Sequence, residues 1–204
     1  MKKIKLLIPI ILSLTLLAAC GSHTNDAKKS SSSSVALSPA NKIAYSLSDY
    51  ERINLNFLSK ASSAKPDAWV KADADNAFGS ETGNSSFKVA GFDATTYQWR
   101  KGNSRITITF AGKGGSRGAF MKSIVSATKA KSSKVATRKA ADTIKVGDSE
   151  ANVKKALGTA YSQSENRTSD GHILHTWQYS LDDGSSLTVK FDNSKIINIA
   201  STPK

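Results

Sequence analysis

The sequence predicts an α+β fold made of two tandem units, each a helix followed by antiparallel strands, with the helices on one face of the sheet. Two observations predict it: internal repetition, and a switch of the apolar period from helical to alternating. Three short blocks recur in the same order, 79 to 81 residues apart. They are Ala77-Phe78-Gly79 with Ala156-Leu157-Gly158, Thr96–Trp99 with Thr176–Tyr179, and Ile106–Phe110 with Leu187–Phe191.

Each unit opens with a predicted helix. In the second copy, Ser149 is a good N-cap, and Glu150 suits the positive end of the helix dipole. Apolar residues then follow at helical spacing until Gly158, which favours a left-handed end. In the first copy, Pro66 and Asp67 are expected to open the helix and Gly79 to end it. The apolar stripes consist of Val70, Ala74, Ala77 and Phe78 in the first copy, and of Val153, Ala156 and Leu157 in the second.

After each helix the apolar residues alternate, which indicates strands with one buried face. Gly102-Asn103 and Asp183-Gly184 lie between alternating runs and predict hairpin turns. We expect three or four antiparallel strands in each copy. The predicted strands cover Tyr97–Trp99, Ile106–Phe110, Ala119–Val125, Ile173–Tyr179, Leu187–Phe191 and Ile196–Ala200.

The N-terminus is typical of an exported lipoprotein. Three lysines precede the almost wholly apolar stretch Ile4–Leu17, which is short for a membrane-spanning helix and contains Pro9. Leu17-Ala18-Ala19-Cys20 resembles the lipobox of bacterial lipoproteins. That resemblance implies cleavage before Cys20, a diacylglyceryl anchor on its thiol, and a location on the outer face of a cell membrane. An ordinary signal peptide with a chance cysteine is the alternative.

The expected organisation is a signal peptide (1–19), a lipidated cysteine with a Ser-rich tether (20–43), repeat 1 (44–126), a basic linker (127–142) and repeat 2 (143–204). Five consecutive serines, Ser30 to Ser34, favour disorder in the tether. Cys20 is the only cysteine, so disulfides, thiolate metal sites and cysteine nucleophiles are excluded from the folded part. Loss of residues 1–19 removes three lysines and lowers the net charge from +13 to +10. This charge favours anionic partners, while export argues against nucleic acid.

Aromatic side chains at matching strand positions are the sharpest binding candidates. Tyr97, Trp99, Trp177 and Tyr179, with His175 beside them, could form an exposed surface for a partner protein. The same residues could instead fill the core between helix and sheet. Their recurrence in both copies favours the core, because fold constraints recur whereas one binding site need not.

The basic residues between the two copies have two interpretations. Lys129, Lys131, Lys134, Arg138 and Lys139 could contact teichoic acid or anionic lipid headgroups. They could equally be a solvated linker. The glycine-rich stretch 112–118 lacks the Gly-Lys-Ser/Thr ending of a phosphate-binding loop, so a strand connection is expected there.

No cofactor or metal is expected. His172 and His175 are three residues apart on a predicted strand, so they should point to opposite faces and could not share an ion. No Gly-x-Ser-x-Gly elbow or flanking carboxylate pair occurs, and Asp182 and Asp183 fit a turn beside Gly184. The sequence therefore predicts a protein that is not an enzyme. Because serines are abundant, a Ser-His-Asp arrangement is the alternative.

The stretch Val146–Gly158, followed by Trp177–Tyr179 and Leu187–Phe191, resembles the β-lactamase-inhibitor-protein-like fold. The same signature occurs in small outer-membrane-assembly lipoproteins and in tandem-repeat lipoproteins of Gram-positive bacteria. The resemblance covers residues 144–200 well and residues 50–125 less well. It implies paired sheet units backed by helices, with a concave face that binds a protein.

Three functions follow as expectations. The first is a non-enzymatic module, anchored through Cys20, that binds another envelope protein. The second is a binding protein for an anionic envelope polymer or lipid, using the positive charge. The third is a hydrolase whose site the sequence does not reveal, which would need a base and a nucleophile within about 3 Å.

Overall fold

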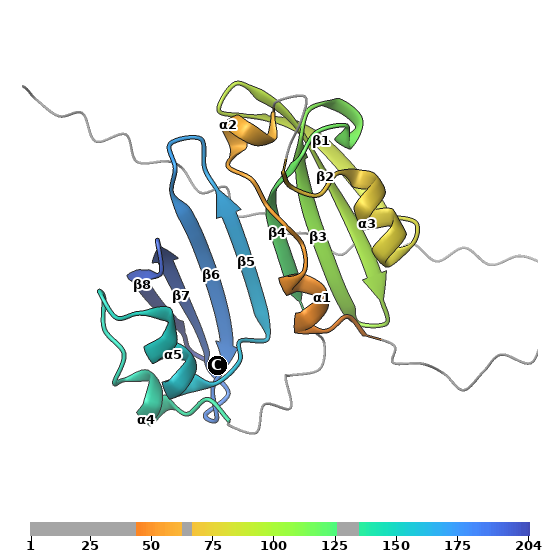
Figure 1. Ribbon diagram of the computed structural model, residues 1–204. Helices are drawn as coiled ribbons and strands as arrows, with labels where there is room; N and C mark the ends of the chain where they lie inside the picture. The colour runs from red at the N-terminus through yellow and green to blue at the C-terminus, as the bar shows by residue number, and fades with distance from the viewer. Residues whose placement is uncertain (1–43, 63–66, 126–134) are drawn as a thin grey trace, which may run out of the picture. The chain divides into compact units, whose positions relative to one another are not determined.

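The computed structural model describes residues 44–62, 67–125 and 135–204. The described strands form one eight-stranded antiparallel sheet in which strand order follows chain order (Figure 1). The strands are β1 (Gly83–Val89), β2 (Phe92–Lys101), β3 (Ser104–Ala111), β4 (Ala119–Val125), β5 (Ser162–Arg167), β6 (Ile173–Ser180), β7 (Ser186–Asp192) and β8 (Lys195–Thr202). Because β4 pairs with β5, the sheet is continuous between the two halves. The signal segment, Cys20, the Ser-rich stretch and Lys129, Lys131 and Lys134 lie outside the described residues.

Short helices accompany the sheet. They are α1 (Leu47–Glu51), α2 (Leu58–Ala61), α3 (Lys71–Phe78), a 3₁₀ turn (Lys113–Gly115), α4 (Arg138–Ala141) and α5 (Glu150–Leu157). The helix expected at Glu150 is confirmed: the Ser149 side chain accepts from the Asn152 amide, and Gly158 ends the helix with φ +76°. No helix among the described segments is long and apolar enough to cross a membrane.

The first predicted helix begins later than expected. It starts at Lys71 rather than near Asp67, because Asp73 accepts a hydrogen bond from the Val70 amide and so caps the helix there, while Pro66 lies outside the described residues. Gly79 ends this helix with φ +83°, as its place in the sequence predicted. The left-handed backbone at Gly79 disfavours any residue with a Cβ.

Two apolar clusters bury the alternating strand residues. The first brings Tyr50 and Ile53 of the α1 region and Ala74 of α3 against β2, β3 and β4. The second brings α4 and α5, through Ala141, Val153 and Leu157, against β6, β7 and β8. Figure 1 shows α1 and α3 over the green strands and α4 and α5 beside the blue ones. We call the side that these strand residues face the core face, and the opposite side the outer face.

A third, smaller cluster forms at one end of the sheet. Leu58 and Ala61 of α2 pack there with Phe120 and with the opposed pair Ala94 and Ala111. Ala94 and Ala111 alternate with core-face residues, so they point to the outer face. The expectation that helices keep to one face therefore does not extend to α2.

The strand register carries one row of opposed residues across the core face. Opposed residues point to the same side of a sheet. The row runs from Tyr97 through Ile108, Lys122, Glu165 and His175 to Phe191. Its two ends lie in the first and second apolar clusters, while its middle is polar. The boundary between the two halves is thus marked by charged side chains on a buried face.

Candidate functional site

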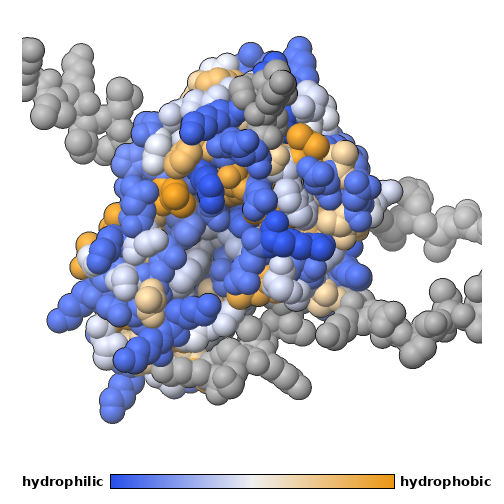
Figure 2. Space-filling view, in the orientation of Figure 1, coloured by the Kyte–Doolittle hydropathy of each residue, from blue (hydrophilic) through white to orange (hydrophobic). Residues whose placement is uncertain are grey.

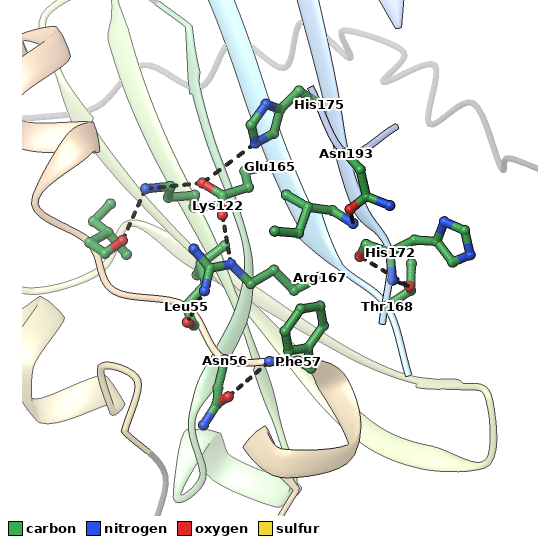
Figure 3. Close-up of polar contacts among 12 residues, drawn as sticks. Leu55, Asn56, Phe57, Lys122, Glu165, Arg167, Thr168, His172, His175 and Asn193 are labelled. Carbon is green, nitrogen blue, oxygen red and sulfur yellow. Dashed lines mark hydrogen bonds and ion pairs between the residues drawn. The ribbon is translucent and has the colours of Figure 1, made fainter. Parts of the chain in front are cut away.

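The polar middle of the core face is a cluster of five ionisable side chains, which we call the junction cluster: Lys122, Glu165, Arg167, His175 and Glu150. β4, β5, β6 and the first turn of α5 supply them. Figure 3 shows four of the five converging where the two halves of the sheet meet. Only 7% of the Lys122 side chain and 11% of the Glu165 side chain are exposed.

Lys122 connects the sheet to the segment that follows α1. Its Nζ donates to the backbone oxygens of Tyr50 at 3.2 Å and Ile53 at 3.0 Å. It also lies 3.4 Å from Glu165 Oε2 and 4.5 Å from the centre of the Tyr50 ring. Burial lowers the pKa of Lys122, and the Glu165 charge offsets this only in part. The ammonium group therefore depends on its full set of acceptors.

Glu165 is held ionised by its neighbours. Burial alone would raise its pKa, but Lys122, Arg167 and His175 together hold the pKa of this carboxyl below its ordinary value. Arg167 Nε donates to Oε1 at 2.7 Å, and its Nη1 donates to the Leu55 backbone oxygen at 2.8 Å. Lys122 and Arg167 thus bind the same stretch of chain, residues 50–55, from strands on either side of the boundary.

The two histidines face opposite sides, as predicted. His175 lies on the core face, with Nδ1 bonded to Glu150 and Nε2 3.9 Å from Glu165. His172 bonds Asp192 at 2.8 Å on the outer face. The carboxylates at His175 meet opposite ring nitrogens, so they cannot share one ion, and the described residues contain no group suited to a metal.

Neither imidazole ring is hydrogen-bonded to a hydroxyl group within the described part of the chain. His172 bonds Asp192, and His175 bonds Glu150. Hydrolysis by a serine or threonine needs a hydroxyl within reach of its base. The histidine contacts present here are hydrogen bonds to carboxylates, which connect strands with each other and with α5.

A groove of about 300 Å³ opens beside the junction cluster, between α1 and α5. Leu47, Glu51 and Lys154 line its sides, and Gln163 and Trp177 line it from the sheet. Trp177 is half-buried and packs 4.7 Å from the Phe191 ring, measured between ring centres. Figure 2 shows the side that carries α1 and α3: hydrophilic residues cover most of it, and hydrophobic ones form small scattered patches.

The aromatic residues expected as a binding surface are mostly in the core. Tyr97, Trp99 and Tyr179 are only 6%, 0% and 2% exposed. Trp99 Nε1 donates to the Gly79 oxygen at 2.8 Å, and the Tyr179 hydroxyl donates to the Gly158 oxygen at 3.4 Å. This corrects the surface interpretation for these three residues, because they pack beneath the helices. Trp177 and His175 remain half-buried at the groove and the junction cluster.

Arg138, which was expected to lie in a basic linker and to contact a polyanion, instead belongs to the folded part. This residue begins α4, and its guanidinium donates to Asp183 at 3.1 Å, Ser185 at 2.7 Å and Ser201 at 3.0 Å. Ser185 and then Arg138 lower the pKa of Asp183 to about 2. Arg138 is therefore committed to the fold rather than offered to a polyanion. Lys139 is exposed.

Away from the apolar cluster at α2, the outer face is mostly polar. Its strand residues are mostly hydroxyl and amide side chains of intermediate exposure. They include Thr96, Gln98, Thr107, Ser123, Ser162, Ser164, Thr176, Gln178, Thr188 and Asn198. These residues were not predicted as a binding surface, because they show no apolar pattern of their own and resemble the residues of loops. Only the alternating apolar residues of the core face indicate where these polar residues lie, because the residues between them must point to the other side.

The comparisons with known proteins concern the fold. No family model matches the chain, and no curated protein matches it. A crystal structure from Streptococcus mutans, described as a "putative beta-lactamase inhibitor protein", matches with a TM-score of 0.58 and 15% identity. The match covers 76% of this chain and 93% of that one. The chain therefore has the β-lactamase-inhibitor-protein-like fold that residues 144–200 resemble.

Proposed function

We propose that this chain is a non-enzymatic module that binds another protein through the outer face of its sheet. The observation that carries the proposal is the outer face of the eight-stranded sheet, on which short polar side chains predominate and against which, among the described residues, α2 packs only at one end. Threonine and serine on strands present hydrogen-bonding groups with little side-chain entropy to lose on binding. The inhibitor description of the Streptococcus mutans protein supports a binding role rather than catalysis.

We also propose that the sheet arose as a tandem repeat of one helix and four strands, α3 with β1–β4 and α5 with β5–β8. The paired hydrogen bonds of Trp99 with Gly79 and of Tyr179 with Gly158 support this, because each ties a sheet aromatic to the glycine that ends the preceding helix. The continuous row of opposed residues supports a shared face for α1, α3, α4 and α5.

The proposed setting is the outer surface of a cell membrane. It rests on the lipobox-like Leu17-Ala18-Ala19-Cys20 and on the Ser-rich stretch after it. A tether of about 22 residues reaches roughly 25 Å, so the folded part would work close to the bilayer. Globomycin treatment, which blocks cleavage of lipoprotein precursors, should cause the precursor to accumulate; substitution of Cys20 by serine should prevent labelling by a clickable fatty acid.

The binding proposal is tested by placing a bulky charge on each surface. Thr176 lies on the outer face in β6, opposite Ser164 and Lys190. Thr176→Arg should abolish capture of a discrete partner from native membranes by the tagged full chain. Ala72→Arg, on the exposed surface of α3, should leave capture unchanged. If partner capture is lost only in Ala151→Arg, binding takes place at the groove and the outer-face proposal is refuted.

A second candidate is binding of an anionic envelope polymer. Lysine and arginine number 29 against 16 acids, which favours such contacts. Binding of this kind should weaken steeply as salt rises. Retention on purified cell walls that does not change between low and high salt would count against it.

A further inference from the structure

The outer face holds two arginines directly opposite each other. Arg100 on β2 pairs with Arg105 on β3 in the strand register. Arg100 follows Trp99 in the sequence, and Arg105 precedes Ile106. Because Trp99 and Ile106 point to the core face, both arginine side chains point to the outer face. Opposed side chains of this kind have Cβ atoms about 4.5–5.5 Å apart, and like charges at that spacing destabilise a sheet.

No acid neutralises this pair within the described residues. Arg100 lies along Gln98: with the amide turned so that its oxygen faces the guanidinium, that oxygen accepts from Nε at 2.6 Å and Nη2 at 3.3 Å. Arg105 makes no hydrogen bond or ion pair to any described residue. Asp192, at the end of β7, is the one acid among the described outer-face strand residues, and it bonds His172, which precedes β6.

Two arginines that are opposed on one sheet face, with no acid beside them among the described residues, can both reach a single anion bound between them. Each guanidinium can form two parallel hydrogen bonds to a carboxylate or phosphate. The repulsion between the two is relieved when an anion lies between them. We propose that Arg100 and Arg105 form the anchor that binds an acidic side chain of the partner protein. This inference rests on the proposed function, because it specifies the chemistry of the same outer face.

The surroundings favour a single acidic side chain over a charged polymer. The row that contains the arginines continues through Val125, Ser162 and Gln178, none of which is charged. Among the described strand residues, the next outer-face cation is Lys190, which lies four strands from β3, about 19 Å away at ordinary strand spacing. A polyanion is held by many cations in series, whereas the described strands of this face offer one concentrated pair among mostly uncharged residues.

The test uses labelled peptides and the purified full chain in lipid nanodiscs. A fluorescent hexaglutamate peptide should bind, and a hexaglutamine peptide of the same length should not. Arg100→Gln with Arg105→Gln should weaken hexaglutamate binding about tenfold or more. Lys139→Gln with Lys145→Gln removes the same charge from exposed sites elsewhere and should change binding less than twofold. The arginine variant should melt at or above the wild-type temperature, because it removes repulsion.

Two results would overturn the inference. One is an equal loss of hexaglutamate binding in the two double variants, which would indicate attraction by net charge alone. The other is preferential binding of purified teichoic acid through the arginine pair, which would make a phosphodiester the ligand. If Thr176→Arg abolishes partner capture while the arginine variant retains it, the proposed function stands and only the acidic anchor fails. If no partner is captured at all, the proposed function fails.

Discussion

Lys122 provides a quantitative test of how the two halves of the sheet are held together. Lys122→Met keeps the length of the side chain but removes the ammonium group that contacts Glu165 and two backbone oxygens. Breaking a buried ion pair costs about 3–5 kcal/mol, because the remaining charge stays buried without its partner. Arg167 still neutralises Glu165 here, at 2.7 Å, so we expect the lower end, about 3 kcal/mol. That is a large part of the 5–15 kcal/mol typical of a folded domain.

The assay is urea unfolding of the full chain followed by circular dichroism, arranged as a double-mutant cycle with Glu165→Gln. The two changes should couple by about 1 kcal/mol or more, so that the double variant is more stable than the sum of the single losses predicts. Lys154→Met, at an exposed site on α5, should stay within about 0.5 kcal/mol of wild type. A loss below about 1 kcal/mol for Lys122→Met, with additive behaviour in the cycle, would refute the role assigned to the junction cluster.

Three further outcomes are expected. Trp99→Phe should destabilise by about 1–3 kcal/mol, measured by thermal or urea unfolding, because the Gly79 oxygen loses its indole donor; an unchanged midpoint would show that this bond is dispensable. Glu165 has a folded-state pKa below its unfolded value of about 4.5, so its contribution to stability should be complete above pH 4.5 and disappear as the pH falls through the folded-state pKa. Glu165→Gln should therefore flatten the dependence of the unfolding free energy on pH over this acid range. An unaltered pH dependence would contradict the assignment. Arg105→Gln should raise the free energy of unfolding by a few tenths of a kcal/mol, because it relieves repulsion from Arg100; a clear loss would mean that the pair is stabilised within the fold.

The sequence predicted the elements that carry a strong apolar pattern. Strands β2, β3, β6, β7 and β8 alternate visibly, and α5 has both its cap and its terminal glycine. Strands β1 and β5 were not predicted because Gly83–Val89 and Ser162–Arg167 are almost wholly polar. They become strands through pairing with their neighbours, so tertiary context decides their conformation.

The candidate site was harder to predict than the fold. Tyr97 and Trp99 share a strand face in either interpretation, and only the position of the helices decides whether that face is buried. Arg138 resembled a linker residue because its partners Asp183 and Ser185 come more than 40 residues later. The junction cluster depends on a register between β4 and β5 that no local pattern specifies.

Photo-crosslinking in living cells tests the central claim, that the outer face binds a protein. Benzoylphenylalanine would be placed at Gln98 and Thr176 on the outer face, and at Ala72 and Ala151 on the exposed surfaces of α3 and α5. Crosslinks to a discrete protein from both outer-face positions, and not from Ala72, are the predicted result. Crosslinks confined to the helix positions, with none from Gln98 or Thr176, would contradict the account.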